Sequence, residues 1–186
     1  EDYVYVSGTS PIFINHFKDY ANSVIERFNP DKEFLVLDIG SNDGTLLNFF
    51  KSNNFQVLGI DPAKSISANA SKNGIETITK FFTNELANEI KKDYKKACVI
   101  TANNVFAHAD NLENIILGIK NLLAKDGIFI FEVSYLVDVF EKNLFDTIYH
   151  EHLSYHSVEP LKNFFLDNGL EMISAQRINT HGGSLR

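Results

Sequence analysis

The chain has 186 residues, of which 44% are hydrophobic, and it carries a formal net charge of −7 at pH 7. This length suits one domain with a buried core, and the acidic balance argues against partners such as nucleic acid or anionic membranes. No apolar stretch reaches the roughly 20 residues of a membrane span. The single cysteine, Cys98, excludes an internal disulfide and a thiolate zinc cage, which is typical of a cytoplasmic protein.

The predicted elements alternate along the chain. Residues 11–28 form the first predicted helix, because apolar side chains recur there at spacings of three and four. The nearly all-apolar run 34–40 predicts a strand buried on both faces. Further helices are predicted over residues 45–51, 65–72, 84–94, 112–124, 136–143 and 160–168, and further strands over 56–61, 76–81, 97–104, 128–134 and 170–178. This alternation predicts a doubly wound α/β sheet.

A glycine-rich turn follows the first strand. The stretch DIGSNDGTLL contains D-x-G-x-x-x-G from Asp38 to Gly44. Glycines let the backbone approach a ligand, and the next helix begins with free N–H groups that favour electron-rich partners. Asp61 ends the second strand, where a carboxylate in such sheets accepts hydrogen bonds from ribose hydroxyls. The pattern favours a nucleoside site over the alternative, a tight turn followed by a solvated aspartate.

The spacing of this turn bears on which nucleoside binds. A dinucleotide site needs G-x-G-x-x-G, and Asn42 stands where the second glycine belongs, which weakens an NAD-binding interpretation. The motif instead resembles the S-adenosylmethionine-binding motif of class I methyltransferases. Asn103 and Asn104 follow the fourth strand, at the rim where such sheets bind ligands. His108 lies on the same rim, where a capping role and a functional role both stay open.

The stretch TIYHEHLSYHS (residues 147–157) gathers three histidines, two tyrosines and a glutamate. A metal site built on His150, His152 and His156 lacks the helical H-E-x-x-H spacing. A structural loop is a second interpretation. The third is acid–base catalysis, in which a histidine accepts a proton, Glu151 orients an imidazole and a tyrosine stabilises an oxyanion.

Seven motifs together resemble the sugar C-methyltransferases that act on nucleotide-linked keto-deoxysugars. They run in order over essentially the whole chain: YVYVSGTSP, LDIGSNDGTLL, GIDPA, ANNVFAH, FEVSYL, FDTIYHEHLSY and HGGSLR. The resemblance implies a class I methyltransferase (Rossmann-like) sheet, S-adenosylmethionine as cofactor, and a keto-sugar nucleotide as the substrate methylated on the carbon beside its ketone. The alternatives are an O- or N-methyltransferase on another small metabolite and a cofactor-binding module without chemistry.

The resemblance also implies individual roles. His152 is the base, and Tyr149 or His108 stabilises the enolate oxygen. The substrate-side set is His152, Glu151, Tyr149, His108 and Tyr3 or Tyr5, whereas Tyr155 and His156 are expected to be structural. Together with the motif analysis, the expected cofactor set is Asp38, Gly40, Ser41, Asn42, Gly44, Asp61, Pro62, Asn103 and Asn104. No metal is expected in the reaction.

The predicted organisation is an N-terminal segment and helix (1–30), a cofactor-binding core (31–135) and a substrate-side segment (136–186), together one methyltransferase domain. Relatives of this kind generally add an N-terminal zinc module and a C-terminal domain, which this sequence lacks, so contacts with such domains of a longer parent chain are expected. The final antiparallel strand would begin at about Ser184 and be truncated, leaving an open slot with unpaired edges. We therefore expect this piece to bind cofactor but to be a poor enzyme alone, and to fill the slot by association.

Overall fold

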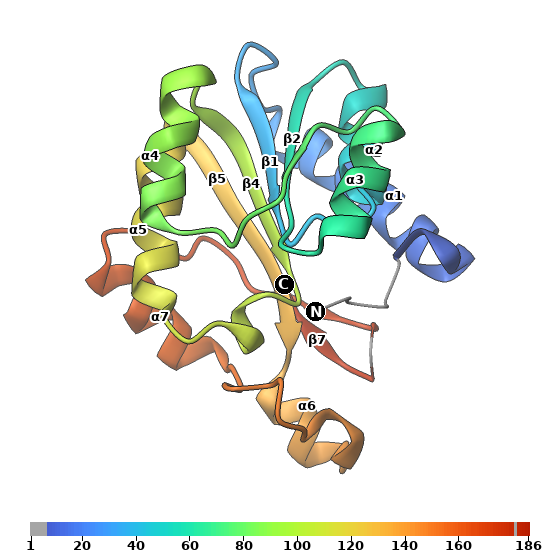
Figure 1. The fold of residues 1–186 in the computed structure, drawn as a ribbon. Coiled ribbons are helices and arrows are strands. Elements are labelled where there is room, and N and C mark those ends of the chain that lie inside the picture. Colours follow the sequence, from blue (N-terminus) through green and yellow to red (C-terminus); the bar gives the residue numbers. More distant parts are fainter. Residues whose placement is uncertain (1–6, 181) are drawn as a thin grey trace.

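The computed structural model describes residues 7–180 and 182–186. Within these residues, seven strands form one sheet in the order β3-β2-β1-β4-β5-β7-β6, with helices on both faces (Figure 1). The α-helices are α1 (Pro11–Phe28), α2 (Thr45–Ser52), α3 (Lys64–Lys72), α4 (Asn84–Asp93), α5 (Leu112–Leu122), α6 (Leu136–Glu141) and α7 (Val158–Asp167), and short 3-10 turns cover Ser7–Thr9, Phe106–His108 and Phe145–Thr147. The strands are β1 (Leu35–Ile39), β2 (Gln56–Ile60), β3 (Thr77–Ile78), β4 (Ala97–Asn103), β5 (Leu123–Ser134), β6 (Arg177–Ile178) and β7 (Ser184–Leu185). The predicted doubly wound α/β sheet is confirmed.

Strand β1 lies at the centre of the sheet and is buried on both faces, as its apolar sequence predicts. Leu35, Leu37 and Ile39 pack toward one core with residues of α4, α5 and α7. Val36 points the other way, into a second core built with α1, α2 and α3. These two helix layers are visible on opposite sides of the sheet in Figure 1. Parallel strands β1 to β5 therefore present their carboxyl ends at one common edge.

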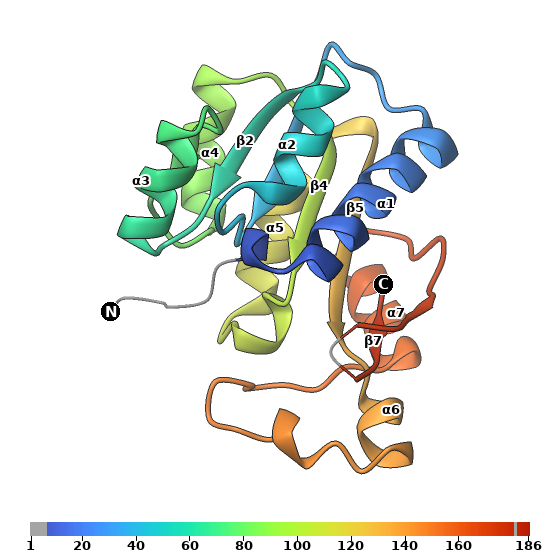
Figure 2. The ribbon, with the colours of Figure 1, turned by 90° about the vertical axis from the view of Figure 1, so that its right-hand side faces the viewer.

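Helix α1 has the predicted bounds. Pro11 occupies its first turn, and Asn29 ends it in the left-handed conformation (φ 43°), with its N–H donating to the Ile25 carbonyl. Its buried face carries Tyr20 together with two aliphatic side chains. This face packs into the second core, and α1 lies across β4 and β5 in Figure 2.

Four predicted elements have different bounds in the structure because strands pair differently from what the sequence indicated. The helix expected to reach Ala124 ends at Leu122, and β5 is already paired at Leu123 opposite Ala97. The turn around Gly127 is accommodated as a register shift before Ile128 pairs with Val99. The strand expected over 76–81 pairs over Thr77–Ile78 and the one expected over 170–178 over Arg177–Ile178. A strand can form ladder hydrogen bonds only along the length of the strand beside it. The strand beside β6 is β7, which has two residues.

Strand β7 occupies the expected position between β5 and β6, antiparallel to both. It therefore fills part of the slot that was expected to be open. On the β7 side, the part of β5 before Val133 has no ladder partner among the described residues. Position 183, just before β7, requires glycine for a steric reason. Gly183 has φ 150°, and a Cβ there would clash with the buried carboxylate of Asp138 in α6.

The segment between β5 and α7 lies beyond the carboxyl ends of the parallel strands in both ribbon views (Figures 1 and 2). Leu153 N–H donates to the Ala107 carbonyl at 2.7 Å, and Tyr135 forms an isolated bridge with His156. These backbone contacts bring residues 147–156 to the loop after β4. No helix in the described part of the chain is long and apolar enough to cross a bilayer.

Candidate active site

The glycine turn after β1 is held closely against β2. Gly40 has φ 71°, and its N–H donates to the Ile60 carbonyl at 2.7 Å. A Cβ on Gly40 would lie 2.6 Å from Val105, in the loop after β4. Glycine is therefore required where the turn passes beneath that loop, at the common edge of β1, β2 and β4.

Asp61 orders this turn from the end of β2. Its carboxylate is 7% exposed and accepts hydrogen bonds from the backbone N–H groups of Asn42 and Ala63, each at 2.9 Å. Asn42 adopts a left-handed conformation (φ 51°) at this contact. The carboxylate is thus fixed in position, and each oxygen keeps a further lone pair for a ligand donor.

Two buried polar atoms on the same rim have no hydrogen-bond partner among the described residues: Ser41 Oγ and Asn103 Oδ1. Buried polar atoms are nearly always hydrogen-bonded. A ligand with hydroxyl and ammonium groups would satisfy both of them and Asp61. The rim therefore fits a nucleoside that carries an amino acid with a free ammonium group, such as S-adenosylmethionine.

Other members of the expected cofactor set are placed differently. Gly44 is the N-cap residue of α2, and a Cβ there would lie 2.9 Å from Ile75, so its lack of a side chain serves packing. Asn104 has φ 55°, and its N–H donates to the Glu132 carbonyl at 2.8 Å, which turns the chain away from β4. Pro62 is exposed at the rim.

Asp38 is the buried carboxylate of the motif. It is 3% exposed and accepts a hydrogen bond from Thr101 Oγ1 at 2.6 Å. Burial raises its pKa to about 7, the Thr101 hydrogen bond partly opposes this rise, and the charge of Asp61 adds to it. Asp38 is therefore costly to ionise until a cation, such as an ammonium group, lies beside it.

Replacing Asp38 with Asn is expected to stabilise the ligand-free protein while weakening cofactor binding. The amide keeps an acceptor for Thr101 and removes the charge whose burial raises the pKa. Because the native pKa exceeds the unfolded value, the cost of Asp38 grows as pH rises from about 4 to 7 and is complete above 7, so the gain should reach on the order of 2–4 kcal/mol at pH 8 and vanish near pH 4.

Thermal melts at pH 5 and 8, with calorimetry against S-adenosylhomocysteine, measure both effects of the Asp38 substitution. Asp93→Asn, at an exposed position in α4, is the matched control and should change neither quantity. A destabilised Asp38→Asn variant at pH 8 would contradict the prediction.

His152 is oriented by backbone rather than by a carboxylate. Its Nδ1 lies 2.7 Å from the Thr147 carbonyl. A carbonyl only accepts, so Nδ1 carries the hydrogen and Nε2 is left as the basic nitrogen. Tyr149 Oη lies 3.2 Å from Nε2 and donates to it. This arrangement gives His152 the tautomer that a general base needs.

His108 lies beside His152, with ring centroids 4.9 Å apart. Its Nδ1 donates to the Glu151 carbonyl at 2.9 Å. Burial and the proximity of His152 lower the pKa of His108. The neutral ring with its hydrogen on Nδ1 presents Nε2 as an acceptor, so it cannot donate to an oxyanion.

The sequence predicted that the Glu151 side chain orients an imidazole, and the structure does not show this contact. Among the described residues its carboxylate makes no hydrogen bond to His108 or His152, and its contribution is the backbone carbonyl that binds His108. The carbonyls of Thr147 and Glu151 orient the two rings instead. Backbone groups in an irregular segment leave no signature in the residue types, which is why the sequence did not reveal this.

The remaining members of the segment make local contacts or face solvent. Tyr155 Oη donates to the Thr147 carbonyl at 3.0 Å, and buried His156 contacts Ser154 Oγ at 3.0 Å, so both bond within the segment. His150 is exposed. Tyr3 and Tyr5 lie outside the described residues. Among the described residues, no three His, Cys, Asp or Glu side chains are grouped to hold a metal ion.

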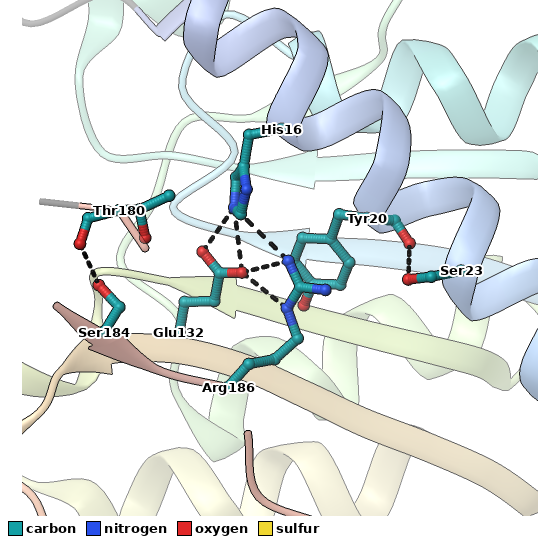
Figure 3. Close-up of polar contacts among 7 residues, drawn as sticks. All are labelled: His16, Tyr20, Ser23, Glu132, Thr180, Ser184 and Arg186. Atoms are coloured by element: carbon teal, nitrogen blue, oxygen red, sulfur yellow. Dashed lines mark hydrogen bonds and ion pairs between the residues drawn. The ribbon is translucent and has the colours of Figure 1, made fainter. Parts of the chain in front are cut away.

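The sequence analysis missed a buried group that we name the Glu132 cluster: His16, Tyr20, Glu132 and Arg186 (Figure 3). Glu132 is 4% exposed, and its two oxygens lie 2.9 and 3.1 Å from His16 Nε2. Arg186 Nε donates to Glu132 Oε1 at 2.7 Å, and its guanidinium lies 3.7 Å from the Tyr20 ring centroid. The available signal was one acid in the otherwise apolar strand IFIFEVS.

Comparisons with known proteins identify the family of this chain. A family model described as a methyltransferase domain matches residues 14–175. The C-methyltransferase NovU of Streptomyces niveus is 36% identical over 183 residues, which are 98% of this chain and 44% of that protein. This chain thus spans less than half the length of that relative.

Solved structures resemble the fold at lower identity. The magnesium protoporphyrin IX methyltransferase ChlM of Synechocystis PCC 6803, with bound SAH, has a TM-score of 0.64 at 18% identity, covering 100% of this chain and 87% of that one. A putative O-methyltransferase of Nostoc punctiforme PCC 73102 has a TM-score of 0.68 at 18% identity, covering 94% and 56%. The sheet order, the glycine turn with its acid and the family match lead to one conclusion: this chain belongs to the methyltransferase domain family.

Proposed function

We propose that this chain is the methyltransferase domain of an S-adenosylmethionine-dependent C-methyltransferase whose substrate is a nucleotide-linked keto-deoxysugar. The cofactor is S-adenosylmethionine, bound along the rim formed by β1, β2 and β4. Transfer to carbon is supported by the similarity to a protein named as a C-methyltransferase. The substrate class is supported by the motifs YHEHLSY and HGGSLR.

One observation carries the proposal: His152 Nδ1 lies 2.7 Å from the Thr147 carbonyl, so the neutral ring keeps Nε2 as its acceptor nitrogen, beside the Tyr149 hydroxyl. Methyl transfer to carbon first requires removal of a C–H proton, whereas transfer to oxygen or nitrogen needs at most one weak base. A neutral imidazole with a fixed tautomer suits proton abstraction beside a ketone. The rate further depends on holding the two substrates together.

The residues then act in sequence. His152 Nε2 takes the proton from the carbon beside the ketone. This requires the Tyr149 hydroxyl to turn from Nε2 to the ketone oxygen first, because Nε2 has one lone pair; the hydroxyl then donates to that oxygen as it becomes the enolate oxygen. Tyr149 stays a neutral donor because burial and the charge of Glu151 raise its pKa. His108, an acceptor at Nε2, suits a substrate hydroxyl better than the enolate oxygen.

Cofactor binding is divided among three positions of the rim. Asp61 would accept hydrogen bonds from the ribose hydroxyls, and Asp38 and Asn103 Oδ1 would bind the ammonium group. When bound, S-adenosylmethionine supplies an electrophilic methyl group. Because the chain covers 44% of NovU, we propose that further domains of a longer chain contribute to substrate binding and turnover.

Mass spectrometry tests the proposal. The protein, alone and within a longer chain that carries it, is incubated with S-adenosylmethionine and a panel of keto-deoxysugar nucleotides. A product heavier by one CH2 is expected, and its NMR spectrum should show the new methyl group bonded to carbon rather than to oxygen or nitrogen. Methylation on oxygen or nitrogen would favour the alternative activity, and no binding of S-adenosylhomocysteine by calorimetry would reject a cofactor role altogether.

A further inference from the structure

The hydroxyl of Tyr20 is buried without a hydrogen-bond partner. Tyr20 is 1% exposed in α1, and its Oη has no partner among the described residues. Phe would fill the same volume without leaving a polar atom unsatisfied. Such an atom in a buried position asks for an explanation beyond packing.

The Tyr20 ring is held in place by charged neighbours. The Arg186 guanidinium stacks on one face at 3.7 Å from the ring centroid. Glu132 binds Arg186 and also His16, which lies one turn before Tyr20 in α1 (Figure 3). The direction of the hydroxyl is therefore set by the cluster and does not adapt to find a partner inside the protein.

Strand register places the polar side chains that neighbour this hydroxyl on one face of the sheet. Asp38 pairs with Thr101, and Asn103 pairs with Glu132, and all four side chains belong to the face of the sheet that α1 covers. Burial, followed by the charges of Glu132 and Asp38, raises the pKa of Tyr20 well above its usual value, against the opposing charge of Arg186. Tyr20 is therefore a neutral hydrogen-bond donor within the field of Asp38.

Sheet order indicates which part of a cofactor would meet this donor. Asp61, the expected ribose acceptor, ends β2, and the rim continues through β1 and β4 to β5. The end opposite the ribose thus lies beside β4 and β5, under α1. An amino-acid group there would place its ammonium beside the unpartnered Asn103 Oδ1. Its carboxylate would then meet the Tyr20 hydroxyl, which lies near the Arg186 guanidinium.

We propose that the Tyr20 hydroxyl donates a hydrogen bond to the carboxylate of the cofactor's amino-acid end, with Glu132 and Arg186 as the residues that position it. This proposal rests on the proposed cofactor. Ser41 Oγ, Asn103 Oδ1 and Tyr20 Oη are all withdrawn from water. Hydrogen bonds formed there are stronger than in water.

Tyr20→Phe is the test, because it removes only the hydroxyl. By calorimetry, the variant should bind S-adenosylhomocysteine at least tenfold more weakly than the unchanged protein. Both should bind 5′-methylthioadenosine equally, because that ligand lacks the amino-acid end. In the ligand-free state the melting temperature should be unchanged or higher, since an unsatisfied buried hydroxyl is lost. Weaker binding without lower stability is an outcome that a packing role does not produce.

Tyr94→Phe is the matched control. Its hydroxyl donates to Glu76 away from the rim, so its loss should leave both ligand affinities unchanged. Three results would overturn the inference: equal affinity of Tyr20→Phe for S-adenosylhomocysteine, equal losses for both ligands, or a lowered melting temperature, which would show that the hydroxyl is satisfied within the protein. Failure of the unchanged protein to bind either ligand would instead reject the proposed cofactor itself.

Discussion

Replacing His152 with Asn is expected to lower C-methylation by about 10²- to 10⁴-fold, the usual contribution of a general base. The Asn amide can still donate to the Thr147 carbonyl, as Nδ1 does at 2.7 Å. It cannot reproduce Nε2, the nitrogen that contacts Tyr149. The loss should therefore fall on turnover, with the affinity for S-adenosylhomocysteine within twofold of the original.

A second measurement isolates proton removal from methyl transfer. Exchange of the substrate's α-hydrogen with deuterated water, followed by mass spectrometry, should collapse in His152→Asn together with methylation. His150→Asn changes the exposed histidine two residues earlier and should retain both reactions. Retained exchange in His152→Asn would remove this histidine from the proton-transfer step.

Replacing Glu132 with Leu is expected to destabilise the fold by about 3–5 kcal/mol, the cost of breaking a buried ion pair by removing one partner. Glu132 is 4% exposed, and its loss leaves the Arg186 guanidinium without its carboxylate. The effect should appear as a lower midpoint in urea unfolding. The double variant Glu132→Leu/Arg186→Leu should recover much of the loss, because a buried pair replaced by apolar side chains is often neutral.

Exposed pairs supply the comparison for this cluster. Lys80 and Glu89 form an ion pair with both side chains more than half exposed, so Glu89→Gln should change the free energy of unfolding by less than about 1 kcal/mol. A Glu132→Leu variant as stable as the original would show that the cluster contributes nothing to stability.

The same cluster predicts a direction for acid unfolding. Burial alone would raise the pKa of Glu132, but the His16 hydrogen bond and the charge of Arg186 lower it below its usual value. The native state therefore binds fewer protons than the unfolded state at this site. Its stabilising contribution is present above about pH 4.3, the unfolded value, and is lost as pH falls through the native pKa. Glu132→Gln should flatten the stability profile below that pH.

Much of the fold was predictable from local pattern. The apolar run of β1 and the three-and-four spacing in α1 predicted both elements closely, because burial on one or two faces depends on residues near in sequence. The failures came where an element depends on a distant neighbour. The strand expected over 170–178 shrank to β6 because its partner β7 pairs over two residues.

The candidate site was predictable to a similar extent. Asp38, Asp61 and the segment 147–157 were located by motif, and the structure brings Tyr149, His108 and His152 together. The carbonyls that orient the imidazoles were not predictable, because every residue carries one. Assignment of catalytic and cofactor roles to these residues stays a prediction for the variants above.

The sequence by itself determined the class of fold and predicted the rim at which a nucleoside would bind, because periodicity and glycine spacing act over a few residues. Only the tertiary structure decided the tautomer of His152, the position of β7 and the Glu132 cluster. That cluster joins side chains separated by 116 and 54 residues. Such contacts depend on the strand order of the sheet and on which helix covers which face. The local sequence around each contacting residue does not specify either.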